Sequence, residues 1–283
     1  MLAFAPMLRL LLAVLLCTAT TSVAAASETC AVKEDVLVQV PYPDSGGVWI
    51  PREAACGGDF PLLILLHGEN ADRERHILVG GWMKLEPTVR ALIDAGKMKP
   101  VLLAEPVQLG AKQDTLYTTR WDPVEHLARL EKELAAHQIR VTAIGYLGHS
   151  AAGCQAKGGL YKVLSMLDEL GPRVNLWAAA DICYLGNYHW LEPANKLARR
   201  NITMLNLHVA HPTGGFENGM DLTRKISCPA GYKKCMAHRR ENWCSFRAKR
   251  GTGIDHKAAP GLLVRDLLMR VYPAEGAPRL CKK

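Results

Sequence analysis

The 283-residue sequence has no internal repeat, no low-complexity tract and no convincing linker. It therefore offers no point at which a second folded domain would begin, and its length suits one large domain. Apolar residues make up 49% of the chain and charged residues 22%, which excludes an intrinsically disordered protein and allows a sizeable core.

The sequence also has almost no net charge outside one segment. Lys and Arg total 35, against 27 Asp and Glu, which gives a formal charge of +8. Residues 224–250 hold nine Lys or Arg and a single acidic residue, Glu241, so the rest of the chain sums to zero. This distribution argues against a nucleic-acid-binding domain with a basic face throughout, and we expect no nucleic-acid partner.

Long apolar runs are confined to the N-terminus. Residues 1–26 combine one positive charge (Arg9), an apolar run and an end rich in Ala, which is typical of a signal peptide cleaved near Ser27. The run falls short of the roughly 20 apolar residues that a membrane helix needs. Lipoprotein processing at Cys17 is disfavoured by Leu16, since a small residue is expected there. We expect a secreted or periplasmic protein.

Cysteine usage agrees with export. Removing the signal peptide leaves eight cysteines: Cys30, Cys56, Cys154, Cys183, Cys228, Cys235, Cys244 and Cys281. An even number in an exported chain predicts up to four disulfide bonds, whose pairing the sequence does not determine. The alternative is a zinc site formed by Cys228, Cys235, His238 and Cys244. Its spacings lack the tight Cys-x-x-Cys pairs of structural zinc sites.

Segments with strand character alternate with segments of helical periodicity. Expected strands are residues 35–40, 48–50, 62–66, 101–104, 141–147, 174–180, 202–209 and 243–248. Expected helices are residues 85–95, 123–137, 151–170 and 261–271. This alternation predicts an α/β fold with a doubly wound, mostly parallel sheet, in a single domain spanning residues 27–283.

One turn between an expected strand and an expected helix has the features of a nucleophile site. Residues 146–153 read Tyr-Leu-Gly-His-Ser-Ala-Ala-Gly. A Ser on a sharp strand-to-helix turn needs small neighbours, and here Gly148 lies two residues before Ser150 and Ala152 two residues after it, in place of the usual Gly. Such a turn exposes the hydroxyl and directs the helix N-terminus at a developing oxyanion. The alternative is that Ser150 only caps the helix.

From residue 35 to about residue 275 the sequence resembles the α/β-hydrolase family. The resemblance depends on His67-Gly68 at the end of a strand, on the Gly148-His149-Ser150 turn and on a late His before the final helix. It implies the α/β-hydrolase fold and a serine hydrolase that needs no metal and no organic cofactor. It says little about the substrate, since this scaffold supports many chemistries.

The resemblance also implies an oxyanion hole. In the family, the loop after the His-Gly strand supplies one backbone N–H and the residue after the nucleophile supplies the other. The matching positions are Glu69, or less favourably Asn70, and Ala151.

A general base must lie within reach of Ser150 on the same edge of the sheet. His256 follows the last expected strand and precedes the closing helix, which is where the family carries its catalytic His, and we favour it. His208 and His211 near the end of the strand 202–209 are alternatives. His149, beside the nucleophile, is expected to direct its side chain away from it.

The base needs a carboxylate to hold its tautomer and to stabilise the imidazolium. Asp181 follows the strand 174–180, and Asp181-Ile-Cys-Tyr is similar to the Asp-x-x-Tyr of some secreted bacterial members of the family. Most members carry the acid one strand later, where Glu217 and Asp221 are available. We favour Asp181, and we disfavour Asp255 because adjacent side chains in a loop seldom face each other.

The basic segment is expected to form a Cys-containing insertion near residues 212–250. One hypothesis is that it holds the protein on an anionic surface, phospholipid or cell-wall polymer, through Arg239, Arg240, Arg247 and Lys249. The alternative is an ordinary solvated face.

Three functional hypotheses follow from the sequence. The first is a secreted hydrolase of carboxylic esters, with Ser150, His256 and Asp181 as its triad. The second is an acyltransferase on the same scaffold, and the third is a non-catalytic binding protein that retains the fold.

Overall fold

The structure is a computed structural model, and it describes part of the chain. The described residues are 32–69, 79–81, 83–110, 112, 115–155, 157–182, 197, 199–209, 224–237, 243–248, 256–276 and 281. The signal peptide expected at residues 1–26 lies outside them and stays a prediction.

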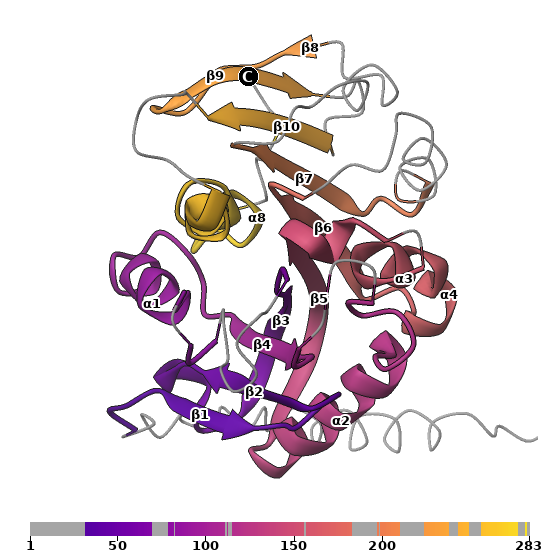
Figure 1. Ribbon diagram of the computed structural model, residues 1–283. Coiled ribbons are helices and arrows are strands. Elements are labelled where there is room, and N and C mark those ends of the chain that lie inside the picture. The colour runs from indigo at the N-terminus through magenta and orange to yellow at the C-terminus, as the bar shows by residue number, and fades with distance from the viewer. Residues whose placement is uncertain are drawn as a thin grey trace, which may run out of the picture. The chain divides into compact units, whose positions relative to one another are not determined.

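Within these residues, ten strands form a single sheet in the order β1-β2-β4-β3-β5-β6-β7-β10-β9-β8 (Figure 1). The strands are β1 (Val36–Gln39), β2 (Ser45–Ile50), β3 (Gly58–Leu66), β4 (Leu102–Val107), β5 (Ile139–His149), β6 (Val174–Ala180), β7 (Thr203–His208), β8 (Arg224–Lys225), β9 (Tyr232–Ala237) and β10 (Trp243–Ala248). The central run from β4 to β10 is parallel, whereas β1, β2, β8 and β9 pair antiparallel with their neighbours. The predicted mostly parallel sheet is confirmed.

Helices cover both faces of the sheet, as the prediction requires (Figure 1). They are α1 (Glu86–Asp94), α2 (Pro123–Ala136), α3 (Gly159–Ser165), α4 (Leu167–Leu170), α7 (Ala259–Leu263), the π-helical turn η4 (Val264–Leu268) and α8 (Met269–Val271). One hydrophobic core lies between the sheet and α2, α3 and α4, and a second lies between the sheet and α1, α7, η4 and α8. Two apolar faces buried in this way explain why the central strands read as continuous apolar runs. None of the described helices is long and apolar enough to cross a membrane.

The described part of the basic segment contributes strands to the sheet. Its described residues form β8, β9 and β10, which extend the same sheet beyond β7. The sequence indicated β10 but not β8 or β9, because charged residues interrupt any apolar run at an edge of the sheet that is only half buried.

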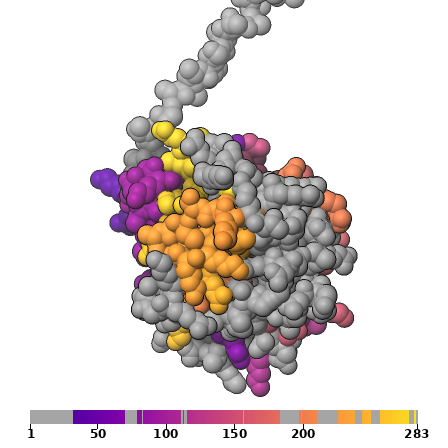
Figure 2. All heavy atoms as spheres, turned by 90° about the horizontal axis from the view of Figure 1, so that it is seen from above, coloured from indigo at the N-terminus to yellow at the C-terminus, as the bar shows by residue number. Residues whose placement is uncertain are grey.

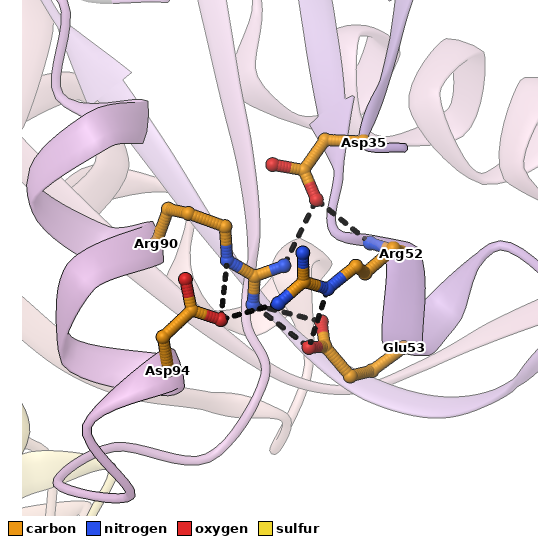
Figure 3. A network of polar contacts seen from close by, with 5 residues as sticks. All are labelled: Asp35, Arg52, Glu53, Arg90 and Asp94. Atoms are coloured by element: carbon orange, nitrogen blue, oxygen red, sulfur yellow. Dashed lines mark hydrogen bonds and ion pairs between the residues drawn. The ribbon is translucent and has the colours of Figure 1, made fainter. Parts of the chain in front are cut away.

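A network of ion pairs joins the start of the sheet to α1 (Figure 3). The Arg90 guanidinium donates to Asp35 Oδ1 and to the Glu53 carboxylate, each at 2.9 Å. Its Nε lies 3.4 Å from Asp94, which also pairs with Arg52 at 2.6 Å. Burial is the largest single influence on the pKa of the Glu53 carboxyl and raises it. Hydrogen bonds from Arg90 and from the backbone, together with the charges of Arg90 and Arg52, lower it by more in sum, so the net shift is downward. The network therefore holds α1 against the residues that precede and follow β1 and β2.

Disulfide bonds account for the cysteines of the basic segment. Cys228 pairs with Cys235, and Cys244 pairs with Cys281 near the C-terminus. The zinc alternative for these cysteines is therefore wrong. Cys56 and Cys154 are disulfide-bonded as well. These bonds are compatible with an extracellular or periplasmic location.

We expect the purified mature protein to show at most two free thiols under non-reducing, denaturing conditions. Six of its eight cysteines are disulfide-bonded in the structure. Free thiols can therefore occur only at Cys30 and Cys183, both outside the described residues. Alkylation followed by mass spectrometry counts the free thiols, and a fully reduced sample supplies the reference count of eight. Four or more free thiols in active protein would contradict the bonding pattern.

Candidate active site

Ser150 directly follows β5 and has a left-handed backbone, with φ at 52°. A non-glycine residue rarely adopts this conformation, and such strain concentrates at functional sites. Its surroundings are tightly packed. A Cβ added at Gly68 would lie 2.7 Å from Ser150 Cβ, and one added at Gly148 would lie 2.6 Å from Leu160 Cγ. The requirement for small residues around the turn is thus met by glycines from two strand ends.

The segment after Ser150 differs from the predicted continuous helix over residues 151–170. It begins with a short 3₁₀ turn, η2 (Ser150–Gly153), and α3 starts only at Gly159. Gly159 has φ at 50°, and a Cβ there would lie 2.0 Å from the carbonyl oxygen of Ala152. This close approach breaks the helix, so the expected helix N-terminus directed at an oxyanion is not formed as predicted.

Asp181 lies at the end of the neighbouring strand. His149 pairs with Ala180 in the parallel register of β5 and β6, so Ser150 and Asp181 are the next residues on adjacent strands. Asp181 is fully buried and also left-handed, with φ at 49°. Its Oδ1 accepts a hydrogen bond from the Val209 N–H at 2.9 Å, and its own N–H donates to the Leu207 carbonyl at 2.7 Å. These bonds fix the carboxylate at the carboxyl edge of the sheet.

His256 begins η3 (His256–Ala258), immediately before α7. Its Nδ1 lies 2.7 Å from Asp181 Oδ2, and its side chain is 30% exposed. The structure therefore brings the favoured base and the favoured acid into direct contact across 75 residues of sequence. In a Ser-His-Asp arrangement the carboxylate contacts Nδ1 of the imidazole, as Asp181 does here, and Nε2 is the nitrogen that exchanges the proton with the nucleophile.

His149 is a neighbour of the base that the sequence did not reveal. Its Nε2 lies 3.0 Å from the His256 carbonyl oxygen, and the two rings lie 4.6 Å apart, tilted by 32°. Burial, helped by the nearby His256, lowers the pKa of His149 to about 4. The ring is therefore neutral at neutral pH, and as a donor to a carbonyl it supports the base. No local pattern marks this role, because it depends on how the final helix packs against β5.

A second buried histidine, His67, orders the strand end that precedes Glu69. The Gln108 N–H donates to His67 Nε2 at 3.1 Å, so the proton lies on Nδ1, which donates to the Gly68 carbonyl at 2.6 Å. Burial lowers the pKa of His67 to about 4. The Tyr117 hydroxyl accepts from the His67 N–H at 3.2 Å. Together these bonds fix the orientation of the Gly68–Glu69 peptide.

The remaining predicted positions fall in different places. Glu69 is exposed and directly follows Gly68, which packs on Ser150, whereas Ala151 is buried. His208 is fully buried within β7 and contacts the Asn206 side chain. The other positions considered lie outside the described residues: Asn70, His211, Glu217, Asp221 and Asp255. Among the described residues, no group of three or more His, Cys, Asp or Glu could hold a metal ion.

No protein-family model matches this sequence, and no curated protein sequence does either. Solved structures do match. A mutant of the feruloyl esterase module from Clostridium thermocellum, in complex with sinapinate, has a TM-score of 0.55 and 12% identity, with 83% of this chain and 87% of that chain covered. A structure named FAE has a TM-score of 0.51 and 13% identity, covering 81% and 87%.

A third match is an uncharacterised protein from Capnocytophaga ochracea, with a TM-score of 0.50, 12% identity and coverage of 86% of this chain and 66% of that one. At these identities the likeness concerns the fold. Together with the strand order, it shows that this chain has the α/β-hydrolase fold.

Proposed function

We propose that the protein is a secreted serine hydrolase that cleaves carboxylic esters through an acyl-enzyme on Ser150. The observation that carries this proposal is the 2.7 Å contact between Asp181 and His256 beside the left-handed Ser150. This is the base-and-acid arrangement that activates a serine nucleophile. The similarity of the fold to a feruloyl esterase module supports ester chemistry rather than identifying the ester.

The reaction follows from these roles. Nε2 of His256 takes the Ser150 proton while Oγ attacks the ester carbonyl carbon, and Asp181 stabilises the imidazolium through Nδ1. The tetrahedral intermediate then collapses, and the leaving alcohol takes the proton from Nε2. Water activated by the same nitrogen attacks the acyl-enzyme, which releases the carboxylic acid and restores the Ser150 hydroxyl.

The neutral state of His149 favours this chemistry. The base becomes positively charged during the reaction, and a second charged imidazole 4.6 Å away would oppose that charge. Because burial lowers the pKa of His149 to about 4, this repulsion is absent throughout the neutral range.

The oxyanion hole would use the N–H groups of Glu69 and Ala151. His67 holds the Gly68 carbonyl, and in a trans peptide the following N–H points the opposite way, so the Glu69 N–H is directed away from the His67 ring. The close approach of Gly68 to Ser150 supports this role for the Glu69 N–H.

A fluorophosphonate probe tests the proposal, because it reacts only with an activated serine. We expect stoichiometric labelling of Ser150, located by mass spectrometry, together with hydrolysis of one or more members of a panel of short- and long-chain carboxylic esters. Heat-denatured protein is the control for non-specific labelling. Unlabelled Ser150 in folded protein would overturn the proposal in favour of a binding protein. Preferential transfer of the acyl group to an added alcohol over water would instead establish an acyltransferase.

A further inference from the structure

A basic pocket lies on β8, β9 and β10, at the edge of the sheet opposite β1. Its volume is about 480 Å³. The described residues that line it are Lys225, Ile226, Cys228, Lys233, Lys234, Cys235, Met236 and Arg247. Four of the eight are cations, and none of these lining residues is Asp or Glu. Figure 2 shows atoms of this part of the chain, in orange, at the surface of the molecule.

The strand register places three of the four cations, Lys225, Lys234 and Arg247, on one face of the sheet. Arg247 on β10 lies directly opposite Lys234 on β9, and Met236, two residues further along β9, lies opposite Lys225 on β8. Directly opposed residues and residues two apart share a face.

The walls of the pocket are held in place by covalent and apolar contacts. The Cys228–Cys235 disulfide closes the turn between β8 and β9, and Ile226 and Met236 supply apolar surface. The aromatic residues of the basic segment do not take part, since Tyr232, Trp243 and Phe246 are buried in the two cores. The pocket is thus cationic and concave, with no aromatic platform among the residues that line it.

We propose that the basic pocket binds a polymer chain that carries repeated anionic groups, carboxylate or phosphate. Arg247 and Lys234 are directly opposed on strands about 4.8 Å apart, and Lys225 lies diagonally from Lys234 at roughly 7–8 Å. Cations on three adjacent strands match successive anionic groups better than they match a single one. A chain can enter a hollow that a flat bilayer cannot. A membrane-docking face would also present exposed apolar side chains. The large exposed hydrophobic residues of the described chain are Val32 and Leu37, and Leu37 lies on β1, at the opposite edge of the sheet.

This proposal sharpens the expectation drawn from the sequence. Of the four residues expected to contact an anionic surface, Arg247 lines the pocket, while Arg239, Arg240 and Lys249 lie outside the described residues. The lysines of the pocket were not singled out from the sequence, because only the β8–β9–β10 register shows that Lys225 and Lys234 share a face with Arg247.

Arg247 brings the pocket close to the carboxyl ends of the parallel strands, where the candidate active site lies. Arg247 pairs with His208, and β10 is three strands from β5, so about 14 Å of sheet separates it from the strand that ends beside Ser150. A polymer held in the pocket would keep its ester groups near the nucleophile. Binding itself does not depend on the proposed hydrolysis and is measured separately.

The test compares two triple variants that remove the same charge. In the pocket variant, Lys225→Gln, Lys234→Gln and Arg247→Gln are combined. In the control variant, Lys33→Gln, Lys97→Gln and Lys132→Gln are combined at exposed positions elsewhere. Binding to sodium polygalacturonate, to inorganic polyphosphate, to neutral dextran and to phosphatidylglycerol vesicles is measured as Kd by biolayer interferometry. Salt is set at about 0.01 M and about 1 M, where the Debye length is about 30 Å and about 3 Å.

We expect the wild type to bind one or both anionic polymers at low salt and to lose binding at high salt. The pocket variant should bind at least roughly tenfold more weakly, and the control variant within about twofold of the wild type. The polymer with the lower Kd identifies carboxylate or phosphate as the recognised group. The substituted side chains are exposed or partly exposed, so we expect both variants to melt at the same temperature as the wild type. This measurement verifies that both variants are folded.

Three results would overturn the proposal. Equal weakening in the two variants would assign the effect to net charge rather than to the pocket. Binding to phosphatidylglycerol vesicles but to neither polymer would identify a lipid surface instead. Equal binding of the wild type and the pocket variant at low salt would leave the segment as a solvated face.

Discussion

Ser150→Ala is expected to lower kcat for ester hydrolysis by about 10⁴-fold to 10⁶-fold, the loss typical of a missing serine nucleophile. The substitution removes only the hydroxyl from a residue packed against Gly68, so the melting temperature should change little. Rates are measured on the best ester of the panel, with active-site titration of the wild type. Ser165→Ala, an exposed serine at the end of α3, is the matched control and should retain full activity.

His256→Ala should cost about as much as Ser150→Ala, because the two residues act as a unit. The double variant should then lose little more than either single variant, whereas independent contributions would multiply. Full activity in His256→Ala would refute the assigned base. His211, which follows β7 in the sequence and lies outside the described residues, would be tested next.

The strands of the central sheet could be predicted from the sequence because a strand buried on both faces is a continuous run of apolar residues. The predicted strands 174–180 and 243–248 coincide with β6 and β10, and the expected helix at residues 123–137 differs from α2 by one residue. Strand β9 was missed for the opposite reason. It lies near an edge, where exposed Lys233 and Lys234 interrupt the apolar pattern.

The candidate site could be located in outline from one topological rule. Residues that follow parallel strands meet at one edge of the sheet, so Ser150 and Asp181, although 31 positions apart in the sequence, were expected to lie close together. The contacts of His149 and His67 could not be predicted in this way. Each depends on which backbone carbonyl lies within reach of the ring, and only the packed chain determines that.

The same distinction explains one local error and one question that the sequence left open. The helix predicted over residues 151–170 does not begin until Gly159, where the chain approaches Ala152 too closely for a side chain. Periodicity in a sequence reports which residues are apolar, and it carries no information on such an approach. Pairing of the cysteines was open for a related reason, since eight cysteines allow 105 pairings and only the fold selects among them.

An experiment can decide which carboxylate is the catalytic acid. The family pattern left Glu217 and Asp221 open beside Asp181, and both lie outside the described residues. Asp181 is the carboxylate that the structure places against His256, fully buried and 2.7 Å from Nδ1. If it is the acid, substituting it should impair the base without disturbing substrate binding.

Asp181→Asn is therefore expected to lower kcat by roughly 10³-fold to 10⁴-fold, with KM nearly unchanged. The amide retains the shape of the side chain, and its oxygen can still accept from the Val209 N–H. Its NH₂ group, however, would donate to His256 Nδ1. This places the imidazole proton on Nε2, where the ring can no longer accept the Ser150 proton. The loss thus arises from the wrong tautomer rather than from a lost contact.

The matched controls are Glu217→Gln and Asp221→Asn, each of which removes one carboxylate charge with the same change of group. Both should keep kcat within a few-fold of the wild type if Asp181 is the acid. The reverse result, a loss of about 10³-fold in one control and near-full activity in Asp181→Asn, would move the acid to the segment after β7. The 2.7 Å contact would then be a structural ion pair, because a carboxylate that holds the base during turnover cannot be neutralised without slowing the reaction.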